Sequence, residues 1–315
     1  MSIARSIILK ASDSIWLREH GTKAPFVRRA VARFMPGETF DDMLGAGRAM
    51  TELGVAGVFT RLGENVKDRA EADEVAAHYL EGIARVRALG LSCEPSIKLT
   101  QLGLDIDREF AYAHALRLAQ AAGEAGSYFW VDMEQSSYVD VTLDIVRRLR
   151  EEVPEVGVCL QAYLMRTGDD LKDITRRGIG VRLVKGAYKE PINVAYPVKA
   201  DVDENYYALA QSMLGTESRA AGSRAVFGTH DVALIARIRR HAADAGIPPS
   251  QYEFHMLYGI QRAEQLRLAR DGAAVRVLLA QARHGDFQRG FRCVVVVFHS
   301  ADHMIGGWMK VKSSD

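Results

Sequence analysis

Residues 181–191 read VRLVKGAYKEP, and this stretch places two permanent cations inside a segment that has the composition of a buried strand. Arg182 and Lys185 interrupt a run of Val and Leu that otherwise favours β-structure. One explanation is an edge strand whose basic side chains extend along apolar surface to reach water. The other is a central strand that delivers both charges to a functional site. The organisation of the whole chain has to decide between them.

One arrangement repeats along most of the chain. An amphipathic stretch rich in Ala, Arg and Leu ends near a glycine, and a short β-branched or aromatic run follows. Glycine just past a helix adopts the left-handed conformation that ends the helix, and a short apolar run bounded in this way is typical of a buried strand. The glycines are Gly54, Gly90, Gly126, Gly157 (with Pro154 ending the helix before it), Gly180, Gly222, Gly246 and Gly272. The runs are VAGVFT (55–60), LSCEPSIKL (91–99), SYFWVDM (127–133), VCLQAYL (158–164), VRLVKGAY (181–188), SRAVFGTH (223–230), QYEFHMLYG (251–259) and AAVRVLLA (273–280).

Strands that alternate with helices pair in parallel. Eight such units at a spacing of roughly 30 residues predict an α/β fold, a closed (β/α)8 barrel of the TIM type. A doubly wound sheet is the main alternative, but no GxGxxG motif follows any of the runs. We predict one domain over residues 1–315, with extra N-terminal helices to about residue 48, a barrel core over 49–280 and a tail over 281–315. Thr39 followed by Asp42 resembles a capping box at the start of one N-terminal helix.

Composition narrows the possible functions. The formal net charge is +1, from 41 basic and 40 acidic residues among 315, so nothing global favours nucleic acid as a partner. The three cysteines Cys93, Cys159 and Cys293 show no CxxC spacing, and we interpret them as small core residues in a reducing compartment. No stretch reaches the roughly 18 apolar residues of a membrane span, and the N-terminus does not resemble a secretory signal. We therefore expect a cytoplasmic protein, with peripheral contact to the inner face of the cell membrane left open.

Charged and polar side chains gather where the expected strands end. In a barrel of this type the chemistry lies at the C-terminal ends of the strands. Taken singly, these residues are more typical of helix caps or solvated loops, but charges rarely enter strands unpaired, so together they indicate a site. The residues at these ends are Glu64, Lys98, Asp132, Glu134, Gln161, Arg182, Lys185, Thr229, His230, Asp231 and His255.

Several chemistries are open for such a site. The sequence has no HExxH and no pair of histidines at ligand spacing, which disfavours a metal. Arg182, Lys185 and the Thr229–His230 pair have the donors that suit an anionic group such as a phosphate, and Gly186 permits close approach of the backbone. A Schiff base on Lys98, as in lyases, is a generic alternative. From the residues alone, the interpretation stops at a barrel enzyme with a large anionic cofactor and a charged small substrate.

The motifs LGEN, SIKL, VDMEQ, VRLVKGAYKEP, FGTHD and FHMLYGI, in chain order, closely resemble those of the proline dehydrogenase family, in its monofunctional bacterial form. The resemblance spans about residues 30–280. It implies a distorted (β/α)8 barrel that binds FAD and oxidises L-proline to Δ1-pyrroline-5-carboxylate, the first step of proline degradation to glutamate. It also implies hydride transfer to flavin N5 and electron transfer to a membrane quinone.

The resemblance further implies roles for individual residues. Asp132 and Arg182 would be catalytic, with Arg182 near flavin N5, where a positive charge favours the reduced flavin. Substrate binding would fall to Lys98, Tyr188 and Leu257. Cofactor binding would fall to Met133, Gln161, Arg182, Val184, Lys185, Gly186, Ala187, Thr229 and His230.

The C-terminal segment departs from the family pattern. The family ends its eighth strand with a Tyr and follows it with an adjacent Arg pair that binds the substrate carboxylate, whereas Leu278 stands at the Tyr position here. Arg289 and Arg292, three residues apart, are the remaining candidates for the substrate carboxylate. Because a charged hydrogen bond contributes about 1.5–3 kcal/mol, an alternative hypothesis is a flavin-binding but catalytically impaired relative. A loss of the ancestral reading frame after about residue 280 would explain the divergence.

Overall fold

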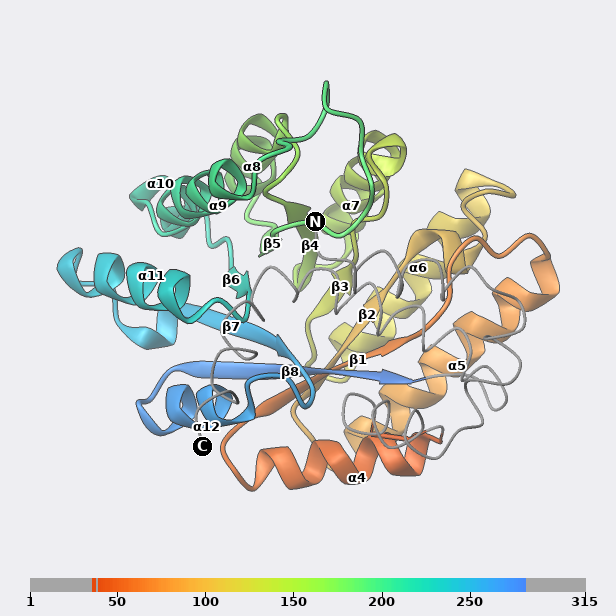
Figure 1. Cartoon of the computed structure of the whole chain (residues 1–315). Coiled ribbons are helices and arrows are strands. Elements are labelled where there is room, and N and C mark those ends of the chain that lie inside the picture. Colours follow the sequence, from red (N-terminus) through yellow and green to blue (C-terminus); the bar gives the residue numbers. More distant parts are fainter. Residues whose placement is uncertain (1–35, 38, 282–315) are drawn as a thin grey trace, which may run out of the picture.

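The computed structural model describes residues 36–37 and 39–281. Eight parallel strands close into a barrel in chain order, β1 to β8, as predicted (Figure 1). Each strand pairs with the next along the chain, and β8 returns to pair with β1 from Ala56↔Arg276 to Arg61↔Gln281. The strands are β1 (Ala56–Arg61), β2 (Cys93–Ile97), β3 (Phe129–Val131), β4 (Val156–Gln161), β5 (Gly180–Val184), β6 (Ala225–Gly228), β7 (Tyr252–Leu257) and β8 (Ala274–Gln281).

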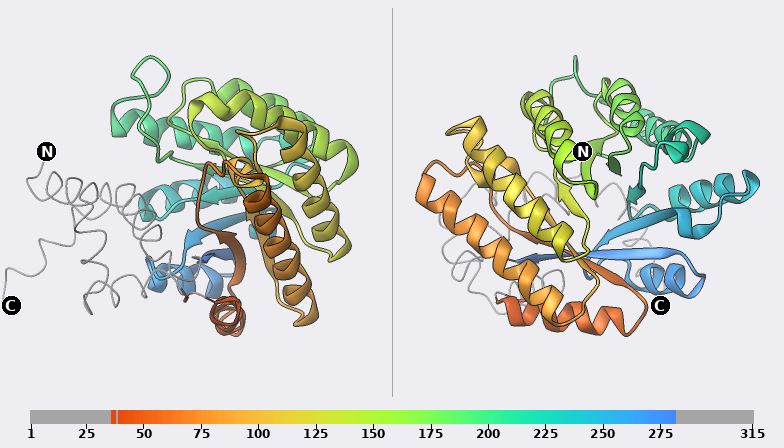
Figure 2. Two further views of the ribbon diagram at one scale, coloured as in Figure 1. Left: turned by 90° about the vertical axis from the view of Figure 1, so that its right-hand side faces the viewer. Right: turned by 180° about the vertical axis from the view of Figure 1, so that it is seen from behind.

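Helices surround the barrel, as both views of Figure 2 show. They are α4 (Phe40–Thr51), α5 (Arg69–Ala88), α6 (Arg108–Glu124), α7 (Val139–Glu152), α8 (Thr167–Arg176), α9 (Lys199–Met213), α10 (Thr216–Ala220), α11 (Val232–Asp244) and α12 (Arg262–Arg270). Short 3-10 turns are η2 (Leu99–Leu102), η3 (Ser136–Tyr138) and η4 (Pro249–Gln251). The outward side chains of the strands and the inward faces of these helices form the main apolar core.

The helix α4 lies against the outer faces of β1 and β8, between α5 and α12 (Figure 1). Its capping box is confirmed, because the Asp42 amide donates to Thr39 Oγ1 at 3.1 Å and the Thr39 amide donates to Asp42 Oδ2 at 3.1 Å. Leu279 of β8 is fully buried at this contact, next to Gly47. The helix ends at Thr51 and so continues past residue 48, while the domain limits themselves stay a prediction.

Left-handed glycines end most of the helices as the sequence predicts. Six of the eight have positive φ, but Gly157 and Gly180 lie within β4 and β5, and Gly178 takes the left-handed turn before β5. Aromatic side chains occupy the space that a Cβ would need at both strand glycines: Trp130, followed by Tyr128, at Gly157, and Tyr128 at Gly180. The Tyr128 hydroxyl donates to Val156 O at 2.8 Å and accepts from the Gly180 amide at 3.0 Å. These glycines therefore make room for an aromatic ring instead of stopping helices.

The pairing register fixes which side chains point into the barrel. Successive residues alternate between the two faces of a strand, so the partners of Trp130, which are Ser96 and Gly157, share its inward direction. Following the register around the barrel gives the inward set Ala56, Val58, Thr60, Glu94, Ser96, Trp130, Asp132, Gly157, Cys159, Gln161, Gly180, Arg182, Val184, Val226, Gly228, Glu253, His255, Leu257, Ala274, Arg276, Leu278 and Ala280. Arg182 is therefore interior, and the edge-strand explanation of its charge is wrong.

Three further expectations from the sequence concern the cysteines, membrane-spanning segments and the two C-terminal arginines. Cys93 and Cys159 are buried free thiols, as predicted, and Cys293 lies outside the described residues. None of the helices within residues 39–281 is long and apolar enough to cross a bilayer. Arg289 and Arg292 also lie outside the described residues.

Candidate active site

A cavity of about 260 Å³ opens at the C-terminal ends of β3 to β8. In a (β/α)8 barrel this is the end where substrates bind. Its lining is Asp132, Met133, Cys159, Gln161, Arg182, Val184, Lys185, Gly186, Ala187, Tyr188, Gly228, Thr229, His230, His255, Met256, Leu257 and Leu278. Twelve residues assigned roles from the sequence are in this set, and Lys98 stands just outside it.

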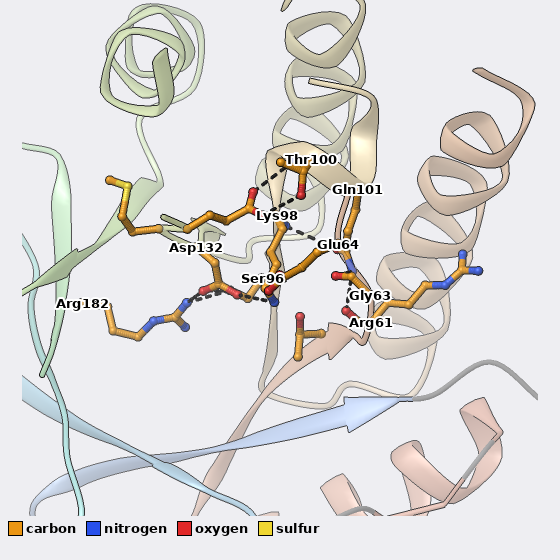
Figure 3. Close-up of polar contacts among 12 residues, drawn as sticks. Arg61, Gly63, Glu64, Ser96, Lys98, Thr100, Gln101, Asp132 and Arg182 are labelled. Carbon is orange, nitrogen blue, oxygen red and sulfur yellow. Dashed lines mark hydrogen bonds and ion pairs between the residues drawn. The ribbon is translucent and has the colours of Figure 1, made fainter. Parts of the chain in front are cut away.

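The centre of the site is a carboxylate between two cations. Asp132 Oδ1 accepts hydrogen bonds from Arg182 and from Ser96 Oγ, and its Oδ2 lies 3.7 Å from Lys98 Nζ (Figure 3). Arg182 is 5% exposed, and it also donates to Ser96 Oγ at 2.7 Å. A guanidinium is tolerated at such burial because its charge is compensated and its donors are used. The Arg182–Asp132 ion pair therefore explains why β5 carries a buried cation.

The ring of Trp130 lies beneath this ion pair. The guanidinium carbon of Arg182 is 5.2 Å from the ring centroid, at cation–π distance. The Trp130 Nε1 donates to Glu94 Oε2 at 2.7 Å, which fixes the ring plane. His255 meets the same ring edge-on, with centroids 5.7 Å apart. Arg182 is therefore positioned from below by an aromatic ring and from the side by a carboxylate.

Gln161 has a fixed orientation and one unused acceptor. It is the last residue of β4, and its side-chain amide nitrogen donates to Glu134 O at 3.1 Å. With the nitrogen assigned in this way, Gln161 Oε1 is buried without a hydrogen-bond partner among the described residues. A buried unpaired acceptor is costly unless a ligand donates to it. The arrangement suits a ligand that carries an N–H or O–H group.

The ammonium of Lys185 is already paired with two carboxylates. Lys185 Nζ donates to Asp203 Oδ1 at 2.5 Å and to Asp231 Oδ2 at 2.9 Å. Burial by itself would lower the pKa of Lys185, but these two hydrogen bonds raise it. Lys185 is thus a permanent cation whose charge is largely compensated by the two carboxylates. What it offers a ligand is one remaining N–H donor, and not a net positive charge.

His230 behaves as a neutral acceptor. The backbone amide of Leu257 donates to His230 Nε2 at 2.7 Å, so the hydrogen of the neutral ring is assigned to Nδ1. Burial lowers the pKa of His230 to about 4. Thr229 beside it is 5% exposed, and its hydroxyl accepts from the Asp231 amide at 3.1 Å. The polar groups that this corner of the cavity offers to a ligand are therefore a neutral imidazole and a hydroxyl, and not an imidazolium.

Tyr188 stands at the mouth of the cavity. Its hydroxyl donates to Glu64 Oε1 at 2.7 Å, which joins the loop after β5 to the loop after β1. Both residues were singled out from the sequence, yet only the closed barrel brings their loops together, because β1 and β5 are not neighbours in the sheet.

Five cavity residues receive no substrate or cofactor role from the sequence: Cys159, Gly228, His255, Met256 and Leu278. Of these, His255 already belongs to the strand-end residues that indicate a site, and Leu278 is named as the residue at the family's Tyr position. Cys159 lies two residues before Gln161, and His255 lies two before Leu257. Since residues two apart share a face of a strand, this spacing was a usable signal for both. Burial lowers the pKa of His255 to about 3, so its ring is neutral at the cavity wall.

No group of three or more potential metal ligands occurs among the described residues. The polar residues that line the cavity come from the ends of five strands, β3 to β7. A closed (β/α)8 barrel whose strand ends surround a cavity with a buried Arg–Asp pair defines a barrel enzyme that binds organic ligands at this end.

Comparison with known proteins identifies the family. Residues 43–288 match the family model for proline dehydrogenase. The chain is 33% identical to proline dehydrogenase 1 of Bacillus subtilis (strain 168) over 255 residues, 81% of this chain and 83% of the relative. It is 37% identical to proline dehydrogenase of Deinococcus radiodurans over 256 residues, 80% of this chain and 81% of the relative. The chain belongs to the proline dehydrogenase family, and it is an oxidoreductase.

Solved structures agree with this fold. A proline utilization A (PutA) structure from Bdellovibrio bacteriovorus, inactivated by N-propargylglycine, superposes with a TM-score of 0.79 at 23% identity. A PutA structure from Corynebacterium freiburgense gives 0.75 at 20% identity. Each match covers 92% of this chain but only about a third of the PutA chain, 34% and 33%. At these identities the likeness supports the barrel fold alone.

Proposed function

We propose that this protein oxidises L-proline to Δ1-pyrroline-5-carboxylate with FAD as cofactor and a membrane quinone as electron acceptor, the first step of proline degradation to glutamate. The observation that carries the proposal is the Asp132 carboxylate set between Arg182 and Lys98 at the cavity of a family member. The pair supplies charges of both signs, as a zwitterionic amino acid requires.

The residues present fit a flavin. Gln161 Oε1 is the unpaired acceptor that a ring N–H would satisfy, with no other partner in the described part of the chain. Met133 and Val184 supply apolar cavity surface, and Thr229, His230 Nδ1 and the remaining donor of Lys185 suit ribityl and phosphate oxygens. When bound, FAD supplies the hydride acceptor, at flavin N5. Arg182 places a buried positive charge beside the cavity, where it favours development of negative charge on a bound ligand.

The substrate side uses different groups. Lys98 is partly buried and in an ion pair with Asp132, so we assign it to the carboxylate of proline. Asp132 then orients the ring nitrogen, and Tyr188 and Leu257 give apolar surface to the ring carbons. An ion-paired ammonium is a poor nucleophile, and this contact argues against the Schiff-base alternative for Lys98.

Anaerobic titration with proline tests the proposal. Protein purified with added FAD is expected to be yellow, and L-proline in the absence of oxygen is expected to bleach the flavin absorbance near neutral pH. Protein that stays colourless and takes up no FAD contradicts the cofactor assignment. Yellow protein that proline does not bleach contradicts the substrate assignment and leaves the flavin site standing.

A second candidate function is flavin binding with impaired oxidation of proline. Its support is Leu278, which lines the cavity at the position where the family pattern has a Tyr. Leu278→Tyr is therefore expected to lower the Michaelis constant for proline severalfold if the impairment is real, because a hydroxyl is restored to the cavity wall. An unchanged or higher constant, with unimpaired wild-type turnover, rules this candidate out.

We also propose a cytoplasmic location with peripheral contact to the inner face of the cell membrane. The support is the quinone acceptor, which resides in the bilayer, together with the absence of a membrane-spanning helix from the described residues. Sedimentation with vesicles that contain quinone, before and after reduction by proline, tests the contact. Protein that remains unbound in both states contradicts it.

A further inference from the structure

Glu134 contacts the turn that carries the substrate lysine. It follows β3 and is 3% exposed. Its Oε2 accepts from Thr100 Oγ1 at 2.6 Å, and its Oε1 accepts from the Thr100 amide at 3.2 Å. Thr100 is the second residue of η2, which begins directly after Lys98. The carboxylate therefore ties the Lys98 turn to the end of the strand that presents Asp132.

The direction of these hydrogen bonds is fixed. Thr100 Oγ1 already accepts from the Asn65 amide at 3.1 Å, so its own hydrogen is directed to Glu134. Thr100 O also accepts from the Val66 amide at 3.0 Å. The loop after β1, which carries Glu64, is thus anchored to the same threonine. Removing the Glu134 carboxylate would leave a buried hydroxyl and amide without an acceptor.

The backbone of Glu134 contacts the cofactor side of the cavity. Its carbonyl oxygen accepts from Gln161 Nε2 at 3.1 Å. This hydrogen bond fixes the side-chain amide so that Gln161 Oε1 is buried and has no hydrogen-bond partner among the described residues. Glu134 therefore contacts both the turn that carries Lys98, after β2, and the side chain of Gln161, in β4. These two strands lie on either side of β3.

The Glu134 carboxyl group itself changes its ionisation state near neutral pH. Burial raises the pKa of Glu134 to about 7, opposed by the hydrogen bonds from Thr100 and by the Lys98 ammonium. The other ionisable groups that face it are Glu64 from the loop after β1, Tyr138 from η3 and Tyr188 from the loop after β5. Its two hydrogen-bond donors from Thr100 require an acceptor, which the ionised form provides most strongly.

We propose that Glu134 is a positioning residue that sets Lys98 against Asp132 and orients Gln161, so that substrate and cofactor sites keep a fixed relation. This inference rests on the proposed function. It assigns no contact between Glu134 and proline. The residue acts through Thr100, and its ionised form is the one that holds the turn.

The test compares Glu134→Gln, Glu134→Ala and Thr100→Val with the control Glu109→Gln, an exposed glutamate that pairs with Arg148. Glu134→Ala and Thr100→Val are each expected to raise the Michaelis constant for proline about tenfold, with turnover at saturation and the FAD dissociation constant within about threefold of wild type. The double variant is expected to match the single variants, because both remove the same contact.

The pH profile separates positioning from a merely structural role. In wild type the Michaelis constant for proline is expected to fall as pH rises through about 7, as the Glu134 carboxylate ionises. Glu134→Gln keeps the shape of the side chain and is expected to lose this pH step. Full additivity of Glu134→Ala and Thr100→Val, or a pH step that persists in Glu134→Gln, overturns the inference.

A separate readout distinguishes this inference from the proposed function. Hydrogen exchange of the backbone amides over residues 98–102 is expected to accelerate in Glu134→Gln and Thr100→Val, whether or not proline is turned over. Unchanged exchange there overturns the positioning role. Wild-type protein that fails to oxidise proline defeats the proposed function instead, and the exchange result then decides the positioning role alone. Glu134→Gln and Thr100→Val keep the test decisive if Glu134→Ala does not fold.

Discussion

Arg182 and Asp132 show how a strand accommodates a buried charge. The guanidinium has a carboxylate, a hydroxyl and an aromatic ring as neighbours, which come from β2, from β3 and from the residue directly after β3. Local sequence around Arg182 contains none of these partners. The compensation is purely tertiary, which explains why the segment looks anomalous when it is read alone.

Replacing the carboxylate is expected to expose this dependence. Asp132→Asn keeps the shape but leaves the Arg182 guanidinium without its counter-charge. Because breaking a buried pair on one side is strongly destabilising, we expect a loss of about 3 kcal/mol in the free energy of unfolding. Urea denaturation measures it, and a loss below about 1 kcal/mol would mean that Ser96 and Trp130 suffice to hold the cation.

His230 is expected to make stability depend on pH. Its pKa is lowered by burial to about 4 in the folded state, whereas an exposed histidine has a value near 6.5. Between these values the unfolded chain binds the proton and the folded chain does not, so stability is lost as pH falls from about 6.5 to 4, by about 2–3 kcal/mol. His230→Gln is expected to flatten this part of the curve of unfolding free energy against pH. Parallel curves for variant and wild type across that window would refute the assignment.

At the scale of elements, the segment after β5 owes its course to a glycine. Gly186 has φ +114, and a Cβ there would fall within the ring of Tyr163. The same segment places Lys185, Ala187 and Tyr188 at the cavity. From the sequence, Gly186 was expected to let the backbone approach a ligand. The structure adds a requirement of the fold itself, because the ring of Tyr163 fills the other side.

Gly186→Ala is therefore expected to be costly, with Gly246→Ala as its matched control. Gly246 also has positive φ, at +66, but no atom lies near its Cβ position. The control is expected to lose about 1 kcal/mol from backbone strain alone. Gly186→Ala is expected to lose about 1–3 kcal/mol more and to weaken FAD binding, since strain and steric overlap add. Equal losses in the two variants, measured by denaturation, would show that Tyr163 yields without cost.

At the scale of the whole molecule, a layer of charges joins the strands below the cavity. Glu94 and Glu253 accept from both Arg224 and Arg276, with nitrogen–oxygen distances of 2.6–3.1 Å. The four residues come from β2, from the residue before β6, from β7 and from β8, so they connect segments that are remote in the sequence. Burial by itself would raise the pKa of Glu253, but His255 and the two guanidinium groups hold it well below the usual range.

Glu253→Gln is expected to destabilise the barrel by about 3–5 kcal/mol at neutral pH, because two partly buried arginines lose one counter-charge. A lowered carboxyl pKa stabilises the fold above the unfolded value near 4.5 and loses that contribution as pH falls below it. The difference between wild type and Glu253→Gln should therefore shrink in acid. The control Glu109→Gln removes an exposed pair of the same chemistry and is expected to change little. A comparable loss in both variants would show that the buried layer has no special weight.

The sequence by itself determined the eight strands, their parallel order and the end at which the chemistry lies. These follow from local rules: glycine ends helices, apolar runs of a few residues are buried, and alternating elements close a barrel. It also marked most cavity residues, because a charged side chain at the end of a buried strand is costly unless it forms an ion pair or binds a ligand. It did not yield the pairing of Arg182 with Asp132, the compensation of Lys185 by Asp203, or the neutral state of His230. Those depend on distances between residues remote in the chain, and only closure of the barrel sets such distances.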